Sequence, residues 1–301
     1  MMPWWKQTWI VARHELSDAV RSRRAAVMMV LYVAGAVTSI NGFINVLQKL
    51  ELQIAQTLGV EALSSAGAVT DTLWKSRPFR NMLMSLVGDR SVAMDLLSIP
   101  PVALIYGWVA FTFVPMLVML VTPARVAEEI GSGAVRFVVP RCTRSAWCAG
   151  KVAGQSALVI LALILSVAGA WTVARLRLPG MDGWAVAQAM MMLAGKTWIY
   201  AFAFVGLAVG IAQFHRSPNQ ATALGFIAWM VLGIVGIMCH FYAGPGIRQI
   251  WLVIELIIPQ GHRMDLWRMD GAYLLSGCAF LASLGMCYAA VGYAYFSRRD
   301  V

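Results

Sequence analysis

Charged residues are scarce in this sequence, and their scarcity excludes a soluble globular protein. They make up 13% of the chain, whereas hydrophobic residues make up 60%. A typical soluble domain has about 25% charged and about 45–50% apolar residues. A soluble core of this size could not hide so many apolar side chains, so we expect lipid to cover many of them.

The residues that membrane enzymes use for catalysis are also sparse. The four histidines, His14, His215, His240 and His262, are scattered, and none belongs to the His-Glu-x-x-His pattern of a metalloprotease. A phosphate-binding loop is absent, because Gly150-Lys151 lacks both the upstream glycine and the following Ser or Thr. We therefore predict that the chain does not hydrolyse ATP and carries no cofactor of its own.

The cysteines give no sign of a disulfide framework or a metal site. Cys142 and Cys148 are six residues apart without partner histidines, which is a poor spacing for zinc. The other three, Cys239, Cys278 and Cys287, lie in apolar runs. A structural or incidental role is the prediction for all of them.

Six apolar runs are each long enough to cross a bilayer, which takes about 20 residues of helix. They cover residues 25–47, 102–122, 152–174, 186–212, 221–241 and 271–296. The chain is therefore predicted to be all-α, a single polytopic membrane domain over residues 1–301 with six transmembrane helices.

The segment before the first span, residues 4–24, combines charged and aromatic residues. Trp5, Trp9, Ala12 and Leu16 recur at three- or four-residue steps, and the charged residues fall between them. This pattern predicts an amphipathic helix on the membrane surface with its tryptophans at headgroup depth. The alternative is a soluble helix packed on a partner.

Two long segments, 48–98 and 242–270, are predicted to lie on the outer side of the membrane. In the first, apolar residues such as Leu73, Phe79 and Leu86 suggest short helices. In the second, Ile250–Ile258 is apolar with one acid, which predicts a re-entrant or interfacial helix.

The distribution of Lys and Arg predicts the orientation, since loops rich in these residues stay on the cytoplasmic side. Without the long segment 48–98, thirteen basic residues lie on the predicted inner side: Lys6, Arg13, Arg21, Arg23, Arg24, Arg125, Arg136, Arg141, Arg144, Lys151, Arg216, Arg298 and Arg299. Five lie on the outer side: Arg175, Arg177, Arg248, Arg263 and Arg268. Both termini are thus predicted to be cytoplasmic. Because these charges flank apolar spans, the net charge of +10 predicts contact with membrane lipids and not with nucleic acid.

A polar island, residues 123–151, separates the second and third spans. Residues 125–130 have the composition of a helix, and Gly131-Ser132-Gly133 is predicted to end it because glycine is costly inside a helix. Residues 134–139 could form a short apolar piece that stops at Pro140. The island is therefore an organised cytoplasmic loop.

The island resembles the cytoplasmic loop of ABC-2 type transporter permeases, the six-helix exporters that include the NosY-like proteins. In that family a glutamate is followed by Gly-Thr, a short apolar stretch, Pro-Val-Ser-Arg, and Gly-Lys at the third span. Here Glu129, Gly133, residues 136–139, Arg144 and Gly150-Lys151 fall at matching spacings.

Two positions depart from the family pattern. Ala134 stands where the family has threonine, and Arg141 stands where it has proline, with Pro140 one residue early. The end of the sixth span, Phe296-Ser297-Arg298-Arg299-Asp300, is typical of the family, so the resemblance covers nearly the whole chain.

The resemblance implies a permease subunit of an ATP-binding-cassette exporter in the inner (plasma) membrane. It also implies partners: two copies of a separate ATP-binding subunit, which holds the Mg-ATP, and a second permease chain. The residues that would contact the ATP-binding subunit are Glu128, Glu129, Gly133, Arg136 and Arg144. The alternative is that these charges are solvated or pair with one another.

Two lysines near or within spans have separate interpretations. Lys151 is expected to anchor the third span at the headgroups. Lys196 lies well inside the fourth span, where a charge is costly, so it faces a transport path, snorkels, or pairs with another group.

Two functions other than transport remain open from the sequence. The chain could be a membrane scaffold or assembly subunit that transports nothing, or an intramembrane enzyme with an unfamiliar motif. The transported substrate is not indicated by any residue pattern.

Overall fold

The computed structural model describes residues 2–58, 80–81, 84, 90–138, 140–241 and 248–298. This part of the chain is built of helices and turns and has no strand. The helices are α1 (Trp4–Arg21), α2 (Arg23–Leu58), α5 (Arg90–Leu97), α6 (Pro101–Gly131), α7 (Val135–Val138), α8 (Arg144–Arg177), α9 (Gly183–Phe214), α10 (Pro218–Phe241), α11 (Arg248–Ile257), the 3₁₀ turn Pro259–His262, α12 (Arg263–Trp267) and α13 (Gly271–Ser297).

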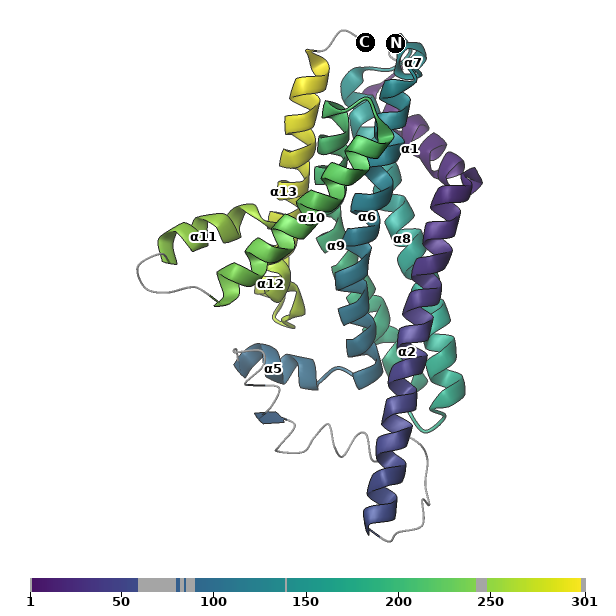
Figure 1. Cartoon of the computed structure of the whole chain (residues 1–301), viewed down its shortest axis with the longest axis vertical. Helices are drawn as coiled ribbons and strands as arrows, with labels where there is room; N and C mark the ends of the chain where they lie inside the picture. Colours follow the sequence, from purple (N-terminus) through teal and green to yellow (C-terminus); the bar gives the residue numbers. More distant parts are fainter. Residues whose placement is uncertain are drawn as a thin grey trace.

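Six of the described helices are long and apolar enough to cross a membrane: α2, α6, α8, α9, α10 and α13. This confirms the predicted all-α fold with six transmembrane helices. Figure 1 shows α2, α6, α8 and α9 running side by side along the long axis, with α13 beside α9.

Helices α6 and α8 extend beyond the predicted spans into the polar island. α6 has 31 residues and α8 has 34, so at 1.5 Å per residue they are roughly 46 Å and 51 Å long. The hydrocarbon layer is only about 30 Å thick. Both helices are therefore longer than the hydrocarbon layer is thick. Because α6 ends at Gly131 and α8 begins at Arg144, much of the predicted loop 123–151 is helical.

Local chemistry accounts for where the segment between α6 and α8 begins and ends. Gly133 has a φ of 73°, a conformation that glycine adopts without strain and that ends a helix. Thr143 caps the start of α8, because its Oγ1 accepts a hydrogen bond from the Ala146 N–H at 3.3 Å. The short helix α7 lies between the two, at the place of the predicted apolar piece.

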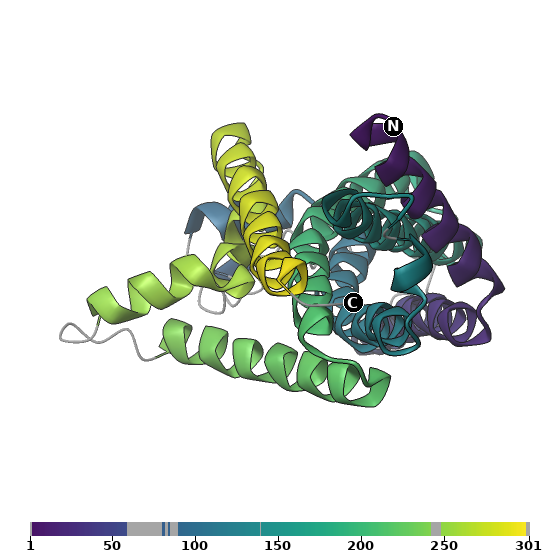
Figure 2. The same ribbon diagram turned by 90° about the horizontal axis from the view of Figure 1, so that it is seen from above.

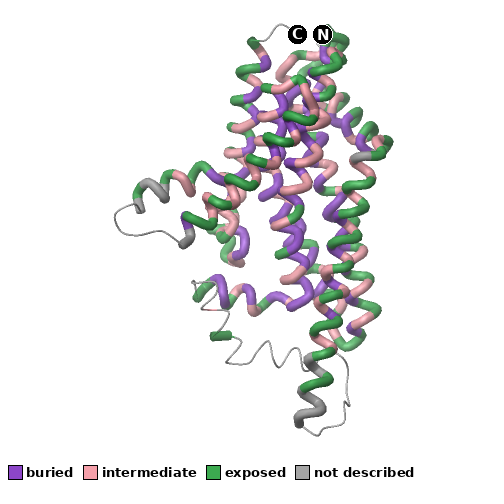
Figure 3. The backbone as a smooth tube through the Cα atoms, viewed as in Figure 1, coloured by how far each residue is buried: buried purple, intermediate pink, exposed green. Residues whose placement is uncertain are grey.

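The core of the bundle is centred on α9, which packs against α6, α8 and α13. Helices α9 and α13 come close together where Gly206 meets the carbonyl of Gly285 and Gly292 meets Gly210. Small residues at these points let two membrane helices approach closely. In Figure 3 the buried residues gather in this interior, while the outer faces of α2 and α10 are largely exposed.

The two ends of the bundle differ in what they carry. Figure 1 places both chain termini and α7 at one end, and α5 and α12 toward the other. Seen from above in Figure 2, α10 and α11 project on the side away from α1 and α2. An even number of spans requires the termini to share one side, and this arrangement satisfies that requirement.

Parts of the two predicted outer segments lie outside the described residues. This applies to Leu73, Phe79 and Leu86, on which the expected short helices depended. In the second segment, residues 248–257 form α11, where a re-entrant or interfacial helix is predicted.

Candidate functional site

The exposed residues around α7 form the outermost surface at the end of the bundle that carries the termini. Glu128 is exposed near the end of α6, and Arg136 and Arg141 are exposed on and after α7. Phe137 is 81% exposed, although it is an aromatic residue. We call Glu128, Arg136, Phe137 and Arg141 the α7 surface.

The backbone beneath the α7 surface is packed against the rest of the protein. Val135, the inward residue of α7, is fully buried. Gly131 lies against the carbonyl of Arg216 in the turn between α9 and α10, so closely that a Cβ there would sit 2.1 Å from that oxygen. The segment from Gly131 through α7 thus packs on the helices beneath it, and we call this segment the tip.

Two other residues predicted to contact the ATP-binding subunit, Glu129 and Arg144, form contacts within the chain. Glu129 forms an ion pair with Lys151. Arg144 donates hydrogen bonds to the carbonyls of Ser297 at 2.7 Å and Phe296 at 3.3 Å, at the C-terminal end of α13. Both residues therefore contact other parts of the same chain, whereas Glu128 and Arg136 are exposed. Contact of these four residues and of Gly133 with an ATP-binding subunit stays a prediction.

Lys151 does not anchor the third span at the headgroups, and that prediction is wrong. Its side chain is only 2% exposed, and its Nζ pairs with the carboxylates of both Glu15 and Glu129. The error arises because the sequence places Lys151 next to polar residues but cannot show that α1 covers it.

Glu15 of α1 is the buried centre of an ion-pair network. It is 1% exposed and accepts from Lys151, from Nε of Arg125 at 3.2 Å, and from Nε2 of Gln155 at 2.5 Å. Arg125 also pairs with Asp18 at 2.6 Å. We call Glu15, Asp18, Arg125, Glu129 and Lys151 the α1 network; it joins α1, α6 and α8.

The electrostatics of Glu15 follow from these neighbours. Burial by itself would raise the pKa of the Glu15 carboxyl, because it disfavours the charged form. The Lys151 ammonium and the Arg125 guanidinium outweigh burial, so the pKa lies below its ordinary value. Glu15 is therefore ionised, and its charge is compensated inside the protein.

Close backbone packing brings α1 to this position. A Cβ on Gly150 would lie 2.5 Å from Cβ of Val11, and a Cβ on Gly154 would lie 2.7 Å from Cβ of Glu15. These two glycines are one turn apart on α8, so they form a flat seam for α1. At the start of α8, the Thr143 N–H donates to Oε1 of Gln7 at 2.9 Å.

The structure thus gives α1 one face that packs on α8. Its opposite face carries the exposed side chains of Trp5 and Trp9. The placement of these tryptophans at headgroup depth stays a prediction, and so does the alternative of a separate partner on that face.

The comparison with known families shows to which family the chain belongs. Residues 9–301 match the model of a family described as ABC-2 family transporter protein. The chain belongs to the ABC-2 transporter family. No curated protein matches the chain. The NosY-like subgroup stays a prediction.

This match places the ABC-2 protein among multi-pass membrane proteins with a transport role. Members of the family work with ATP-binding subunits, which is consistent with a chain that is not itself an enzyme. Within the part of the chain that the structure describes, His, Cys, Asp and Glu form no group of three that could hold a metal ion.

The remaining predicted residue of this ABC-2 protein, Lys196, lies in α9 and is buried. Its Nζ donates to the carbonyl of Arg268 at 3.0 Å, and the next N–H, that of Met269, donates to Oδ2 of Asp95 at 2.9 Å. Lys196 and Asp95 thus hold the segment before α13 from two sides. This contact accounts for the buried amine, while a role in a transport path stays a prediction.

Phe137 and Glu15 are the residues of this site that the sequence reasoning missed. Phe137 lies within the predicted apolar piece, where an apolar residue is expected to be covered. Glu15 lies between the apolar positions of the amphipathic pattern, and nothing in that pattern singles it out. The signal for Glu15 was the pair of glycines, Gly150 and Gly154, one turn apart on the opposite helix.

Proposed function

We propose that this chain is the transmembrane permease subunit of an ATP-binding-cassette exporter in the inner membrane. A separate subunit binds and hydrolyses Mg-ATP, and the permease itself uses no cofactor. Two permease chains and two ATP-binding subunits form the working complex, and an unidentified substrate is exported. Family membership and the six spans support this proposal.

The α7 surface is the proposed docking site for the ATP-binding subunit. It lies at the end with the termini, which the positive-inside rule assigns to the cytoplasm. It combines one exposed aromatic residue, Phe137, with the exposed arginines Arg136 and Arg141. Aromatic residues and Arg dominate the binding energy of many protein interfaces, and charges such as Glu128 set orientation.

The α1 network is proposed to transmit the motion of the docked subunit. It joins the inner ends of α1, α6 and α8, so these three ends move as one body. Removing one partner of a buried ion pair costs about 3–5 kcal/mol, so the joint resists separation. In this mechanism, closure of the two ATP-binding subunits rocks the bundles between inward and outward access.

The single observation that carries the proposal is the exposure of the α7 surface on a firmly seated tip. To test it, the tagged chain is purified from native membranes after photolabelling with 8-azido-ATP. We expect the label on a co-purified soluble subunit and not on the chain itself. Phe137→Ala and Glu128→Lys should each lower the amount of labelled subunit about tenfold.

Trp184→Ala is the matched control, because Trp184 is 71% exposed at the opposite end of the bundle. It should leave the labelled subunit unchanged. A label on the chain itself would favour the intramembrane enzyme. A stable complex without any labelled subunit would favour the scaffold. Equal losses for Trp184→Ala and Phe137→Ala would remove the α7 surface from the mechanism.

A further inference from the structure

An apolar groove runs between α2 and α6 and is not used by the proposed coupling mechanism. Its larger part has a volume of about 290 Å³ and is lined by Gly35, Ser39, Val109 and Phe113, among others. A smaller hollow of about 50 Å³ continues from it, and the two share Met28 and Leu117. An apolar cavity of about 150 Å³ already binds benzene, so this space is large enough for a hydrocarbon ligand.

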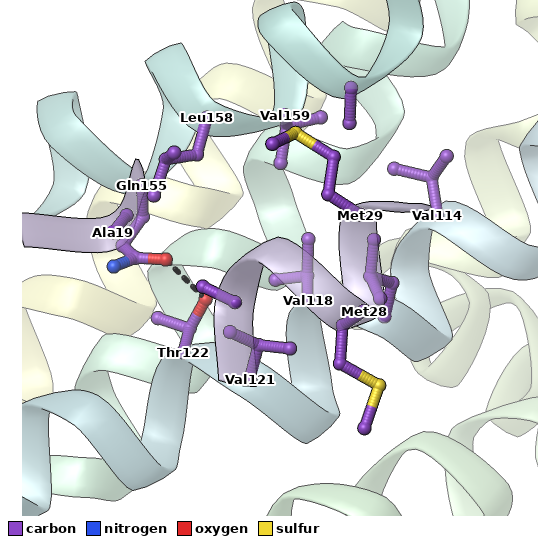
Figure 4. A pocket seen from close by; sticks show the side chains of 13 residues that line it. Ala19, Met28, Met29, Val114, Val118, Val121, Thr122, Gln155, Leu158 and Val159 are labelled. Carbon is purple, nitrogen blue, oxygen red and sulfur yellow. Dashed lines mark hydrogen bonds between the residues drawn. The ribbon is translucent and has the colours of Figure 1, made fainter. Parts of the chain in front are cut away.

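The smaller hollow leads toward the end of the bundle with the α1 network. Figure 4 shows its wall of apolar side chains, including Met28 and Val118, with the Thr122–Gln155 pair at one side. Thr122 donates to Gln155 at 2.9 Å, and Gln155 donates to Glu15, so these polar groups already have partners. The groove therefore offers an occupant apolar contact.

The groove stays open because α2 is held by α8. Gly169 of α8 approaches Val37 so closely that a Cβ there would lie 2.8 Å from Cγ2 of Val37. Further along α2, Arg177 of α8 donates to Oδ1 of Asn41 at 2.7 Å and to Oδ1 of Asn45 at 2.8 Å. On the groove side of α2, a Cβ on Gly35 would meet nothing within 4 Å.

The groove is longer than one leaflet of a bilayer but does not reach through the whole hydrocarbon layer. The lining residues of α2 run from Ala25 to Ser39, which is about 21 Å of helix. The hydrocarbon layer is about 30 Å thick. An acyl chain reaches about half of that depth, whereas a transmembrane helix of a second copy would need a groove through the whole layer.

The charged residues at the mouth of the groove indicate which kind of lipid headgroup would lie there. Ala19 and Ala25 both line the hollow, and the bend between α1 and α2 lies between them in the chain. This bend carries Arg21 and Arg23, which are both exposed. Basic residues at the inner membrane surface attract anionic lipids.

We propose that the α2–α6 groove binds one acyl chain of an anionic glycerophospholipid, whose phosphate contacts Arg21 and Arg23. The lipid fills the space that α2 leaves beside α6. It thereby completes the packing between the first two spans. This site does not depend on the ATP-binding subunit, so it can be tested on the purified chain.

The test is lipid retention by the full chain in mild detergent, measured by native mass spectrometry. The protein is incubated with an equimolar mixture of phosphatidylglycerol and phosphatidylcholine that carry the same acyl chains. We expect one retained phosphatidylglycerol. Gly35→Leu fills the groove and should lower its retention at least about tenfold.

Gly42→Leu is the matched control, because a Cβ on Gly42 also meets nothing within 4 Å, and Gly42 does not line the groove. It should retain lipid like the wild type, and both variants should unfold at similar temperatures. Arg21→Gln with Arg23→Gln should reduce the preference for phosphatidylglycerol by about thirtyfold, since each basic residue contributes about fivefold.

Four results would overturn the proposal. The first is equal retention in Gly35→Leu and the wild type. The second is a loss in Gly42→Leu as large as that in Gly35→Leu. The third is an unchanged lipid preference after both arginine substitutions. The fourth is a disulfide-linked dimer of Ser39→Cys in native membranes, which would show that a second copy occupies the groove.

Discussion

Glu128 and Glu129 are neighbours in sequence with opposite surroundings. Successive residues in an α-helix point about 100° apart, so one side chain can face solvent while the next faces the protein. Glu128 is exposed, whereas Glu129 pairs with the buried Lys151. A change at Glu128 thus acts on the α7 surface, and a change at Glu129 acts on the α1 network.

Lys151 is the residue whose removal should most disturb the α1 network. Lys151→Met leaves Glu15 buried with fewer compensating charges, which should cost about 3–5 kcal/mol of unfolding free energy. Adding Glu15→Gln should recover a large part of this loss, because the uncompensated carboxylate is then gone. Thermal unfolding of the detergent-purified chain measures both effects.

A loss below about 1 kcal/mol for Lys151→Met would contradict the buried pairing. Arg136→Met serves as the control, because Arg136 is exposed on α7. Exposed charges contribute little to stability, so this variant should unfold like the wild type.

At the scale of elements, α1 packs on the bundle, and its place at the membrane surface stays a prediction. Its packing on α8 depends on Gly150 and Gly154, where no side chain separates the two backbones. The network then aligns the polar groups of α1 with those of α6 and α8. An apolar seam and an ion-pair network together make this joint specific, because each requires the same register.

Gly154→Leu should displace α1 from α8. The new side chain would clash with Cβ of Glu15 and with the carbonyl of Ala12, which lie 2.7 Å and 3.1 Å from the position of a Cβ. The measurement is the rate at which a water-soluble maleimide labels Ala12→Cys in a chain whose native cysteines are replaced by alanine. We expect the rate to rise about tenfold.

Gly195→Leu is the control for this experiment, because a Cβ on Gly195 meets nothing within 4 Å. Its labelling rate should stay at the starting value. Fast labelling of Ala12→Cys before any glycine is changed would mean that α1 does not rest on α8.

At the scale of the whole molecule, the two ends of the bundle carry different structural features. One end gathers the termini, α1 and the α7 surface (Figure 1). Toward the other end, Lys196 and Asp95 secure the segment before α13. This separation suits a protein that receives a motion on one side and changes its shape toward the other.

The orientation of these ends can be tested directly. In a chain without native cysteines, Phe137→Cys and Trp184→Cys place thiols at the two exposed ends. A membrane-impermeant maleimide should label Phe137→Cys in inside-out vesicles and Trp184→Cys in right-side-out vesicles. The reverse pattern would place the α7 surface outside the cell and would remove it from contact with an ATP-binding subunit.

The sequence by itself determined the features that depend on local composition. Long apolar runs identify the six spans, because burying them in lipid is favourable wherever their neighbours lie. Gly133 marks the turn beyond α6, because its positive φ is a local property of glycine. The motif around Glu129 likewise indicates the family, because its spacing is a property of the sequence alone.

Only the tertiary structure decided which polar groups meet. Lys151 and Glu15 are 136 residues apart, and no periodicity in either helix predicts that they form a pair. The same holds for Arg144 at the end of α13 and for Lys196 beside Arg268. Such contacts depend on how helices cross, and the crossings arise from glycines and small residues on facing surfaces that become neighbours only after the chain has folded.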